Sequence, residues 1–170
     1  KPSHRKIPYT MYKMGLLTGA RSKSANMVGR TMQLNPHGDA AIYETMVRLS
    51  RGYEALLHPY VDSKGNFGKA YSRDMMWAAS RYTEAKLDPI SAELFKDIDK
   101  DTVDFVDNYD STMKEPTLLP VTFPSVLVNN NTGIAVGMAS SICSFNLEEG
   151  CRTTIELIRN PDHCIADTLK

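Results

Sequence analysis

The sequence predicts an α+β fold that is mainly helical, and two observations predict it. Between residues 1 and 52, apolar side chains recur every three or four positions in three successive segments, as they do on the buried face of a helix. Beyond residue 56, short apolar and aromatic runs flank clusters of glycine and asparagine, the composition of strands joined by turns. The chain has 170 residues, of which 42% are hydrophobic, so it can bury a core of its own.

Three helices are expected before residue 53. The first covers residues 1–17, where Pro8 removes an amide donor, so the helix either begins near Pro8 or bends there. Ser24 is a candidate cap for a second helix over residues 23–34, and Asp39 caps a third that stops at Gly52. The short break NPHG between the second and third makes them a helix-turn-helix candidate, although the same spacing is common in plain helical bundles.

Residues 57–72 predict a β-hairpin, because apolar and aromatic runs lie on both sides of the sequence DSKGN. A hairpin after a helix-turn-helix is a wing, and Lys64 and Lys69 would give this wing contacts to phosphate groups, which need only a positive charge near the backbone. The hairpin therefore favours a winged helix over a plain bundle.

Helix and strand alternate in the remaining chain. Asp88 and Pro89 predict the cap and first position of a helix that continues to about residue 100. Alternating carboxylates near its end resemble a Mg²⁺ site, but ligands at every second position diverge on a helix, so we interpret Asp97, Asp99 and Asp101 as a solvated helix end. Strands are expected over residues 102–110 and 124–128, then a polar turn and a stretch of small residues, and a last helix that ends at Asn160.

The net charge of zero conceals an asymmetry along the chain. Residues 1–38 contain seven basic residues and no acid, whereas residues 84–115 contain ten acids and four lysines. A basic segment next to an acidic one fits a face that binds a polyanion on a body that repels it elsewhere, although two ordinary solvated faces would give the same pattern.

Several kinds of chemistry lack their motifs in this sequence. No glycine-rich nucleotide loop is present, and the histidines lack the spacing of metal ligands. Cys143, Cys151 and Cys164 form no CxxC pair and are expected to be reduced core residues. No apolar run reaches the roughly 18 residues that cross a bilayer, so we expect a cytoplasmic protein without a membrane partner.

Arg81 and Tyr82 are candidates for phosphodiester chemistry. A phenol is a weak nucleophile at its usual pKa of about 10, so a neighbouring cation is needed to favour phenolate and to stabilise the charged transition state. Arg81 supplies one cation, and His37 could supply another if the fold brings it near. Eight tyrosines are present, and packing is the ordinary role of any one of them.

Six motifs then identify a resemblance. KPSHRK, NPHGDAAIYETMVRLSR, VDSKGNFG, ASRYTEAKL, DTVDFVDNYD and GIAVGMA follow one another as in the A subunit of bacterial type IIA DNA topoisomerases, the family of gyrase and topoisomerase IV. The resemblance covers nearly the whole chain and thins after about residue 145. It implies a winged-helix DNA-cleavage domain over residues 1–88 and the first part of a mixed α/β tower domain over residues 89–170.

The resemblance also implies roles for individual residues. Tyr82 would attack DNA to form a 5′-phosphotyrosine bond, with Arg81 and His37 at the same phosphate. Ile134 would wedge between base pairs and bend the DNA, although a core residue of a buried strand is the ordinary interpretation. The residues expected to grip DNA near the break are Lys1, His4, Arg5 and Lys6, and Lys64 is the residue expected to do so from the wing.

Departures from the family's pattern weaken some of these assignments. Members usually have histidine at the position of Asn35 and arginine at the position of Lys6, which keeps the charge without the bidentate fork. Ala40 and Glu44 fall in the quinolone-contact region, where susceptible enzymes usually carry serine and an acid. Because alanine cannot hold the water of a drug-bound Mg²⁺, the resemblance implies reduced quinolone sensitivity.

The expected partners are double-stranded DNA, a second copy of the chain and a B subunit. The resemblance implies that these residues bind no cofactor themselves and that Mg²⁺ and ATP act through the B subunit, so the residues should bind DNA but cut it poorly alone. This sequence does not distinguish gyrase from topoisomerase IV. Two rivals remain, a non-catalytic winged-helix regulator and a structural dimerisation domain, and neither accounts for six motifs in register.

Overall fold

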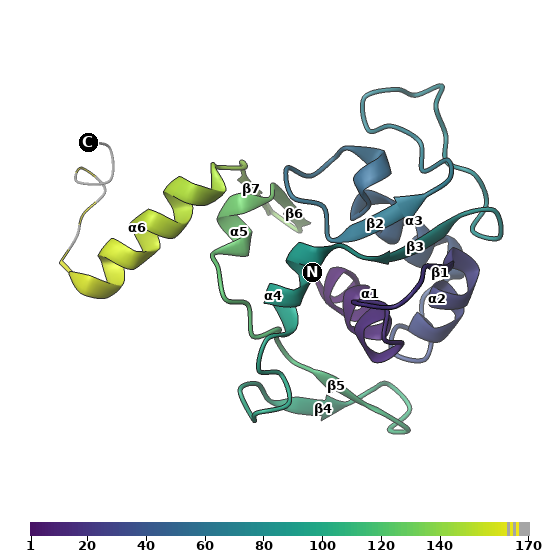
Figure 1. Cartoon of the computed structure of the whole chain (residues 1–170), viewed down its shortest axis with the longest axis horizontal. Coiled ribbons are helices and arrows are strands. Elements are labelled where there is room, and N and C mark those ends of the chain that lie inside the picture. The colour runs from purple at the N-terminus through teal and green to yellow at the C-terminus, as the bar shows by residue number, and fades with distance from the viewer. Residues whose placement is uncertain (163, 165, 167–170) are drawn as a thin grey trace. The chain divides into compact units, whose positions relative to one another are not determined.

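The computed structural model describes residues 1–162, 164 and 166. The chain divides into two compact units, Lys1–Val121 and Thr122–Lys170. Both units mix helices with small antiparallel sheets (Figure 1), so the α+β prediction is confirmed at the level of fold class.

Three helices pack together in the first unit: α1 (Pro2–Lys13), α2 (Ser24–Thr31) and α3 (Asp39–Arg48). Their core is built from side chains that are at most 1% exposed, namely Ile7, Met11, Met27, Ile42, Met46 and Val47. These residues recur at the spacing that predicted the helices, because a helix returns to the same face every three or four residues.

The starts of the three helices differ from prediction by a few residues. Pro8 lies buried inside α1, and the helix begins instead at Pro2, where a missing donor costs nothing. Ser24 and Asp39 are each the first residue of their helix rather than its cap. The Asp39 carboxylate still accepts the backbone N–H of Ala40, at 2.8 Å.

A three-stranded antiparallel sheet in the order β1-β3-β2 completes this part of the fold. Its strands are β1 (Ser22–Lys23), β2 (Val61–Lys64) and β3 (Glu84–Leu87), with Val61 opposite Leu87 and Lys64 opposite Glu84. The predicted hairpin within residues 57–72 is wrong, because β2 pairs with β3 across a connection of residues 65–83. Phe67, only 1% exposed, turns its ring toward Tyr43 and so takes the chain out of the sheet. Figure 1 shows the connection as a long loop that extends away from the sheet.

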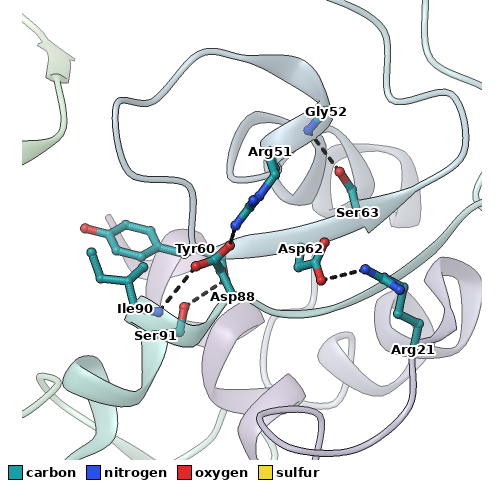
Figure 2. Close-up of polar contacts among 9 residues, drawn as sticks. All are labelled: Arg21, Arg51, Gly52, Tyr60, Asp62, Ser63, Asp88, Ile90 and Ser91. Carbon is teal, nitrogen blue, oxygen red and sulfur yellow. Dashed lines mark hydrogen bonds and ion pairs between the residues drawn. The ribbon is translucent and has the colours of Figure 1, made fainter.

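Polar contacts fix the ends of β2 and β3 (Figure 2). Asp88 forms an ion pair with Arg51, in the short helix η1 (Arg51–Tyr53), and its second oxygen accepts the N–H of Ile90 at 3.3 Å. The predicted capping role of Asp88 is therefore confirmed. The other contacts drawn are Arg21 to Asp62 at 2.7 Å, Gly52 N–H to the Ser63 hydroxyl at 2.9 Å, and the Ser91 hydroxyl to the Tyr60 carbonyl at 2.7 Å.

The helix predicted after Asp88 is shorter than expected. It consists of η2 (Pro89–Ser91) and α4 (Ala92–Phe95), and it ends there because Lys96 takes a non-helical ψ of 127° and Asp97 a positive φ of 64°. Asp97 instead forms an ion pair with Lys100 at 2.8 Å. The strand predicted over residues 102–110 is confirmed only in its centre, as the three-residue β4 (Phe105–Asp107), which pairs with β5 (Lys114–Pro116).

Residues 89–121 pack on the helices of the same unit. The Lys6 ammonium lies 3.1 Å from the Glu115 carboxylate and donates to the Leu34 carbonyl at 2.7 Å. The Tyr12 and Phe95 rings stack with centroids 4.5 Å apart. The division between the two compact units therefore falls near residue 121. The expected boundary at residue 88, between a DNA-cleavage domain and a tower domain, stays a prediction.

The second unit contains α5 (Ser125–Val128), β6 (Asn131–Ala135), β7 (Met138–Ile142) and α6 (Leu147–Arg159). The buried strand predicted at residues 124–128 is wrong, because Pro124 precedes a single helical turn there. The stretch of small residues forms a hairpin instead, with Gly137 at a φ of 76° in its turn. The last helix is confirmed, and the Asn146 side chain caps it by accepting two backbone N–H groups.

The burial of the three cysteines differs from the prediction. Cys143 and Cys164 are exposed and Cys151 is half-buried, so the prediction that all three are core residues is wrong. They fall in and beside a hairpin and a helix whose described residues bury few side chains. No helix within the described residues is long and apolar enough to cross a membrane.

Candidate active site

Tyr82 projects from a turn immediately before β3. Its side chain is 66% exposed, and the guanidinium carbon of Arg81 lies 4.7 Å from the centroid of its ring. A cation over an aromatic face is attracted by the negative face of the ring. The structure thus places the positive charge of Arg81 directly against the candidate nucleophile.

The backbone around Tyr82 is held firmly although its side chain is exposed. Its N–H donates to the Ala79 carbonyl at 2.9 Å, which closes the turn. The first two N–H groups of α2 donate to the same segment, from Ser24 to the Thr83 carbonyl at 3.0 Å and from Ala25 to the Ser80 carbonyl at 3.2 Å. Amides at a helix N-terminus have no partner within their own helix, so the end of α2 anchors the turn that carries Tyr82.

His37 is exposed in the loop between α2 and α3. Its backbone N–H donates to the carbonyl of Asn35, which is only 4% exposed, at 2.8 Å. Within the described residues no hydrogen bond joins His37 to Tyr82 or Arg81. The imidazole is therefore available to a ligand, and its role at the same phosphate stays a prediction.

The N-terminal turn of α1 carries a cluster of basic residues, Lys1, His4 and Arg5. Lys1 is exposed, whereas His4 and Arg5 are half-buried. Two of their atoms, His4 Nδ1 and Arg5 Nε, are buried without a hydrogen-bond partner. Burial, together with the positive charges of the N-terminal ammonium, the Lys1 side chain and Arg48, lowers the pKa of His4 to about 4. A neutral imidazole and an unpaired guanidinium donor leave this turn with unmet capacity to bind an anion.

Two lysines that were predicted to grip DNA are engaged elsewhere. Lys6 has only 14% of its side chain exposed, and its ammonium is held by Glu115 and Leu34. Lys64 is 70% exposed, with its ammonium 3.8 Å from the Glu84 carboxylate across the β2–β3 pair. The contacts of Lys6 support a structural role, because its charge is neutralised inside the unit.

Ala40 and Glu44 both lie on α3. Ala40 is exposed in the first turn, and Glu44, one turn later, accepts from Arg48 at 2.6 Å. The positive charge of Arg48, at the C-terminal end of α3, also contributes to lowering the pKa of His4. Arg48 was not predicted from the sequence; its position four residues after Glu44, on a helix with a polar face, was the available signal.

Ile134 belongs to the β6–β7 hairpin of the second unit. It is 89% exposed, and Val136 at the turn is fully exposed. The interpretation of Ile134 as a core residue of a buried strand is therefore wrong. Large apolar side chains exposed on a hairpin are available for contact with a partner.

No group of three or more histidine, cysteine or acidic residues that could hold a metal ion occurs within the described part of the chain. The donor atoms present thus do not form a Mg²⁺ site, and no chemical step is assigned to a metal held by these residues.

Comparison with known proteins gives the family. The family model for the A subunit of DNA gyrase/topoisomerase IV matches residues 1–170. The chain is 44% identical over 172 aligned positions to the DNA gyrase A subunit of Staphylococcus aureus, in strains NCTC 8325, COL and MRSA252 alike.

The chain belongs to the DNA gyrase/topoisomerase IV A-subunit family. The match covers all of this chain but only 19% of the length of each of those S. aureus relatives. This gyrase/topoisomerase IV family chain therefore spans about a fifth of the length of the relatives that it matches. The resemblance inferred from the six motifs is confirmed.

Proposed function

We propose that this chain is part of the DNA-cleavage and rejoining subunit of a type IIA topoisomerase, with Tyr82 as the nucleophile. The observation that carries the proposal is the geometry of one turn, in which an exposed tyrosine lies against an arginine on an anchored backbone. Membership in the gyrase/topoisomerase IV A-subunit family supports the same reaction. Family membership does not favour a non-catalytic regulator.

The proposed step is a transesterification at a DNA phosphate. The Tyr82 phenol loses its proton, and its oxygen forms a bond to the phosphorus, which stays on the new 5′ end of the cut strand. The bond from phosphorus to the 3′-oxygen of the neighbouring nucleotide breaks, and that oxygen takes up a proton to become a 3′-hydroxyl. Rejoining is the reverse reaction. No net bond energy is lost, because one phosphodiester replaces another, so resealing needs no nucleoside triphosphate.

Arg81 and His37 have separate tasks in this proposal. The Arg81 guanidinium lies on the ring of Tyr82 and can turn one of its N–H groups toward the phosphate oxygens, where charge accumulates. His37 binds the phosphate or moves the proton. Both side chains are exposed, so neither has to break internal packing to reach the DNA.

A winged helix is the finer fold that we propose for the first unit. Three packed helices with an antiparallel β1-β3-β2 sheet, whose second and third strands are joined by a long loop, fit that arrangement. On it, Lys1, His4 and Arg5 face DNA together with Arg48, and Lys64 adds a more distant contact. The charged members of this set, Lys1, Arg5, Arg48 and Lys64, give an affinity that falls steeply with salt concentration.

Ile134 is proposed as the wedge that opens a base step and bends the DNA. An apolar side chain can unstack a step when bending lets the protein gain further contacts. Its 89% exposure on a hairpin supports this role.

The complete enzyme is proposed to contain two copies of this subunit together with a B subunit, and to act on double-stranded DNA in the cytoplasm at the bacterial nucleoid. Mg²⁺ and ATP are supplied through the B subunit, so DNA passage is coupled to ATP hydrolysis there. The residues described here then bind DNA and provide the nucleophile, but cut DNA poorly without that partner.

The test uses the full-length subunit with its B partner, Mg²⁺ and end-labelled DNA, stopped with detergent. Wild-type protein is expected to become attached to the 5′ end of the DNA, and Tyr82→Phe is expected to bind DNA without attachment. Equal attachment by both proteins would place the nucleophile elsewhere. If both proteins bind DNA and neither becomes attached to it, the non-catalytic regulator is favoured.

A further inference from the structure

The hydroxyl of Tyr43 connects the two flanks of the turn that carries Tyr82. It donates to the Ala78 carbonyl at 2.9 Å, on the N-terminal side of the turn, and lies 2.8 Å from the Thr83 hydroxyl on the C-terminal side. Tyr43 itself belongs to α3 and is only 6% exposed. One buried phenol therefore closes residues 78–83 into a fixed loop.

The contact continues into α2. The Thr83 hydroxyl also lies 2.8 Å from the Ser24 hydroxyl, and both residues are completely buried. Burial raises the pKa of Tyr43, so its hydroxyl remains a neutral donor at ordinary pH. Hydrogen bonds among buried groups such as these are costly to break, because water cannot replace a lost partner.

We propose that Tyr43 is a positioning residue for the cleavage reaction, which holds the Tyr82 backbone in place through Ala78 and Thr83. This inference rests on the proposed function of Tyr82. It makes α3, the helix that exposes Ala40 and Glu44, a direct support of the nucleophile turn.

The need for such a support follows from the exposure of Tyr82. Its side chain is 66% exposed and its ring contacts Arg81, which is itself exposed, so packing within the described residues does little to fix the phenol. The position of its oxygen then depends on the backbone of residues 78–83. A displacement of about 1 Å can reduce the rate of a positioned reaction about a hundredfold.

The test compares variants of the full-length subunit with its B partner, Mg²⁺ and a short DNA duplex. Tyr43→Phe removes the bridging hydroxyl, and its control is Tyr9→Phe, the same change at another tyrosine that is 6% exposed. We expect the rate of covalent complex formation at saturating DNA to fall about tenfold to a hundredfold in Tyr43→Phe, with the Kd for DNA unchanged. Tyr9→Phe should match the wild type in both quantities.

A second pair of variants distinguishes a positioning role from a general loss of stability. Thr83→Val removes the other half of the bridge, and Thr31→Val is its control, since Thr31 is equally buried and its hydroxyl donates to the Met27 carbonyl of its own helix. Thr83→Ser keeps the hydroxyl and should restore most of the rate that Thr83→Val loses. If cleavage falls equally in Thr83→Val and Thr31→Val, or if DNA affinity falls in parallel with the rate, the role is merely structural and the proposal fails.

Tyr82→Phe is measured beside these variants. If it abolishes the covalent complex while Tyr43→Phe and Thr83→Val cleave at the wild-type rate, Tyr82 is the nucleophile and the positioning role of Tyr43 is wrong. If Tyr82→Phe cleaves like the wild type, the proposed function itself fails. The two failures therefore give different results.

Discussion

Arg81 lies over the ring of Tyr82, with its guanidinium carbon 4.7 Å from the ring centroid. The two side chains are adjacent in sequence and both exposed, so their contact is made without help from the core. In the proposed reaction, the guanidinium beside the phenol can also neutralise the DNA phosphate that the phenol attacks.

Replacement of Arg81 should therefore affect cleavage more than DNA binding. Arg81→Lys keeps the charge but loses the planar group that stacks on Tyr82 and forks toward phosphate. We expect the rate of covalent complex formation to fall about a hundredfold, with the Kd for DNA changed by less than about threefold, in rapid-quench and filter-binding assays. A parallel loss of affinity and rate would show that Arg81 only binds DNA.

Replacement of Lys6 should weaken the fold and leave DNA binding intact. In Lys6→Met the Glu115 carboxylate, which already has one buried oxygen without a partner, loses its counterion. We expect a loss of about 2 kcal/mol in local stability, seen as faster hydrogen exchange of α1 and β5 amides. Lys13→Met, the same change at an exposed residue of α1, is the control.

The salt dependence of DNA binding decides between the two roles of Lys6. If Lys6 contacts phosphate, as the sequence predicted, Lys6→Met should reduce the slope of log K against log salt by about 1. We expect that reduction in Lys1→Met and an unchanged slope in Lys6→Met.

Local signals predicted much of this fold correctly. Apolar spacing located α1, α2, α3 and α6 to within a few residues, because those helices bury one face or cap their own ends. Turn residues gave a wrong prediction where a contact between residues distant in sequence determined the course of the chain. The sequence DSKGN resembles a hairpin turn, yet burial of Phe67 takes the chain out of the sheet, and β2 pairs with β3 instead.

The candidate site was predicted from motifs, but its supports were not. Tyr82, Arg81 and His37 carry recognisable chemistry in a recognisable order. The side chains at the flanks of the Tyr82 turn, Tyr43 and Thr83, are ordinary residues 40 positions apart, and only the fold brings their hydroxyls to 2.8 Å. Lys6 was predicted to contact DNA because it lies in a basic segment. Its partner, Glu115, is far away in the sequence, so only the fold shows the ion pair.

The stability of the first unit should fall in mild acid through His4. Burial lowers the pKa of His4 to about 4, so the folded state binds the proton less tightly than the unfolded state, where the pKa is near 6.5. Stability from this residue is complete above pH 6.5 and is lost as the pH falls toward 4, because the unfolded state is protonated first.

Urea unfolding followed by fluorescence of Trp77, the chain's single tryptophan, measures this effect. Between pH 7 and pH 4 the wild-type midpoint should decrease more than that of His4→Gln, which cannot take up the proton. His37→Gln, which changes an exposed imidazole, should follow the wild type. Identical curves for wild type and His4→Gln would contradict the lowered pKa.

Replacement of Ala40 by serine should increase sensitivity to quinolones. Ala40 is exposed in the first turn of α3, and its methyl group cannot hold the water of a drug-bound Mg²⁺. Ala40→Ser supplies that hydroxyl without disturbing the Glu44–Arg48 ion pair one turn away. We expect stimulation of cleavage at lower quinolone concentrations than for the wild type. Equal stimulation would show that this position does not set drug sensitivity.

Truncation of Ile134 should reduce DNA bending before it reduces DNA affinity. The side chain is 89% exposed, so Ile134→Ala removes little packing within its own unit and should leave the fold unchanged. Unstacking a base step costs a few kcal/mol, which the smaller alanine can no longer offset by filling the gap. We expect a smaller bend by energy transfer between dyes at the two ends of a duplex, and slower cleavage with it.

The neighbouring residue Val136 supplies the control for Ile134. Val136 is fully exposed at the turn of the same hairpin, so Val136→Ala removes apolar surface of similar kind two residues away. If the bend depends on the one side chain that enters the base step, Val136→Ala should bend DNA like the wild type. Equal losses in both variants would show that the whole tip of the hairpin contacts DNA as an apolar surface, and an unchanged bend in Ile134→Ala would exclude the wedge.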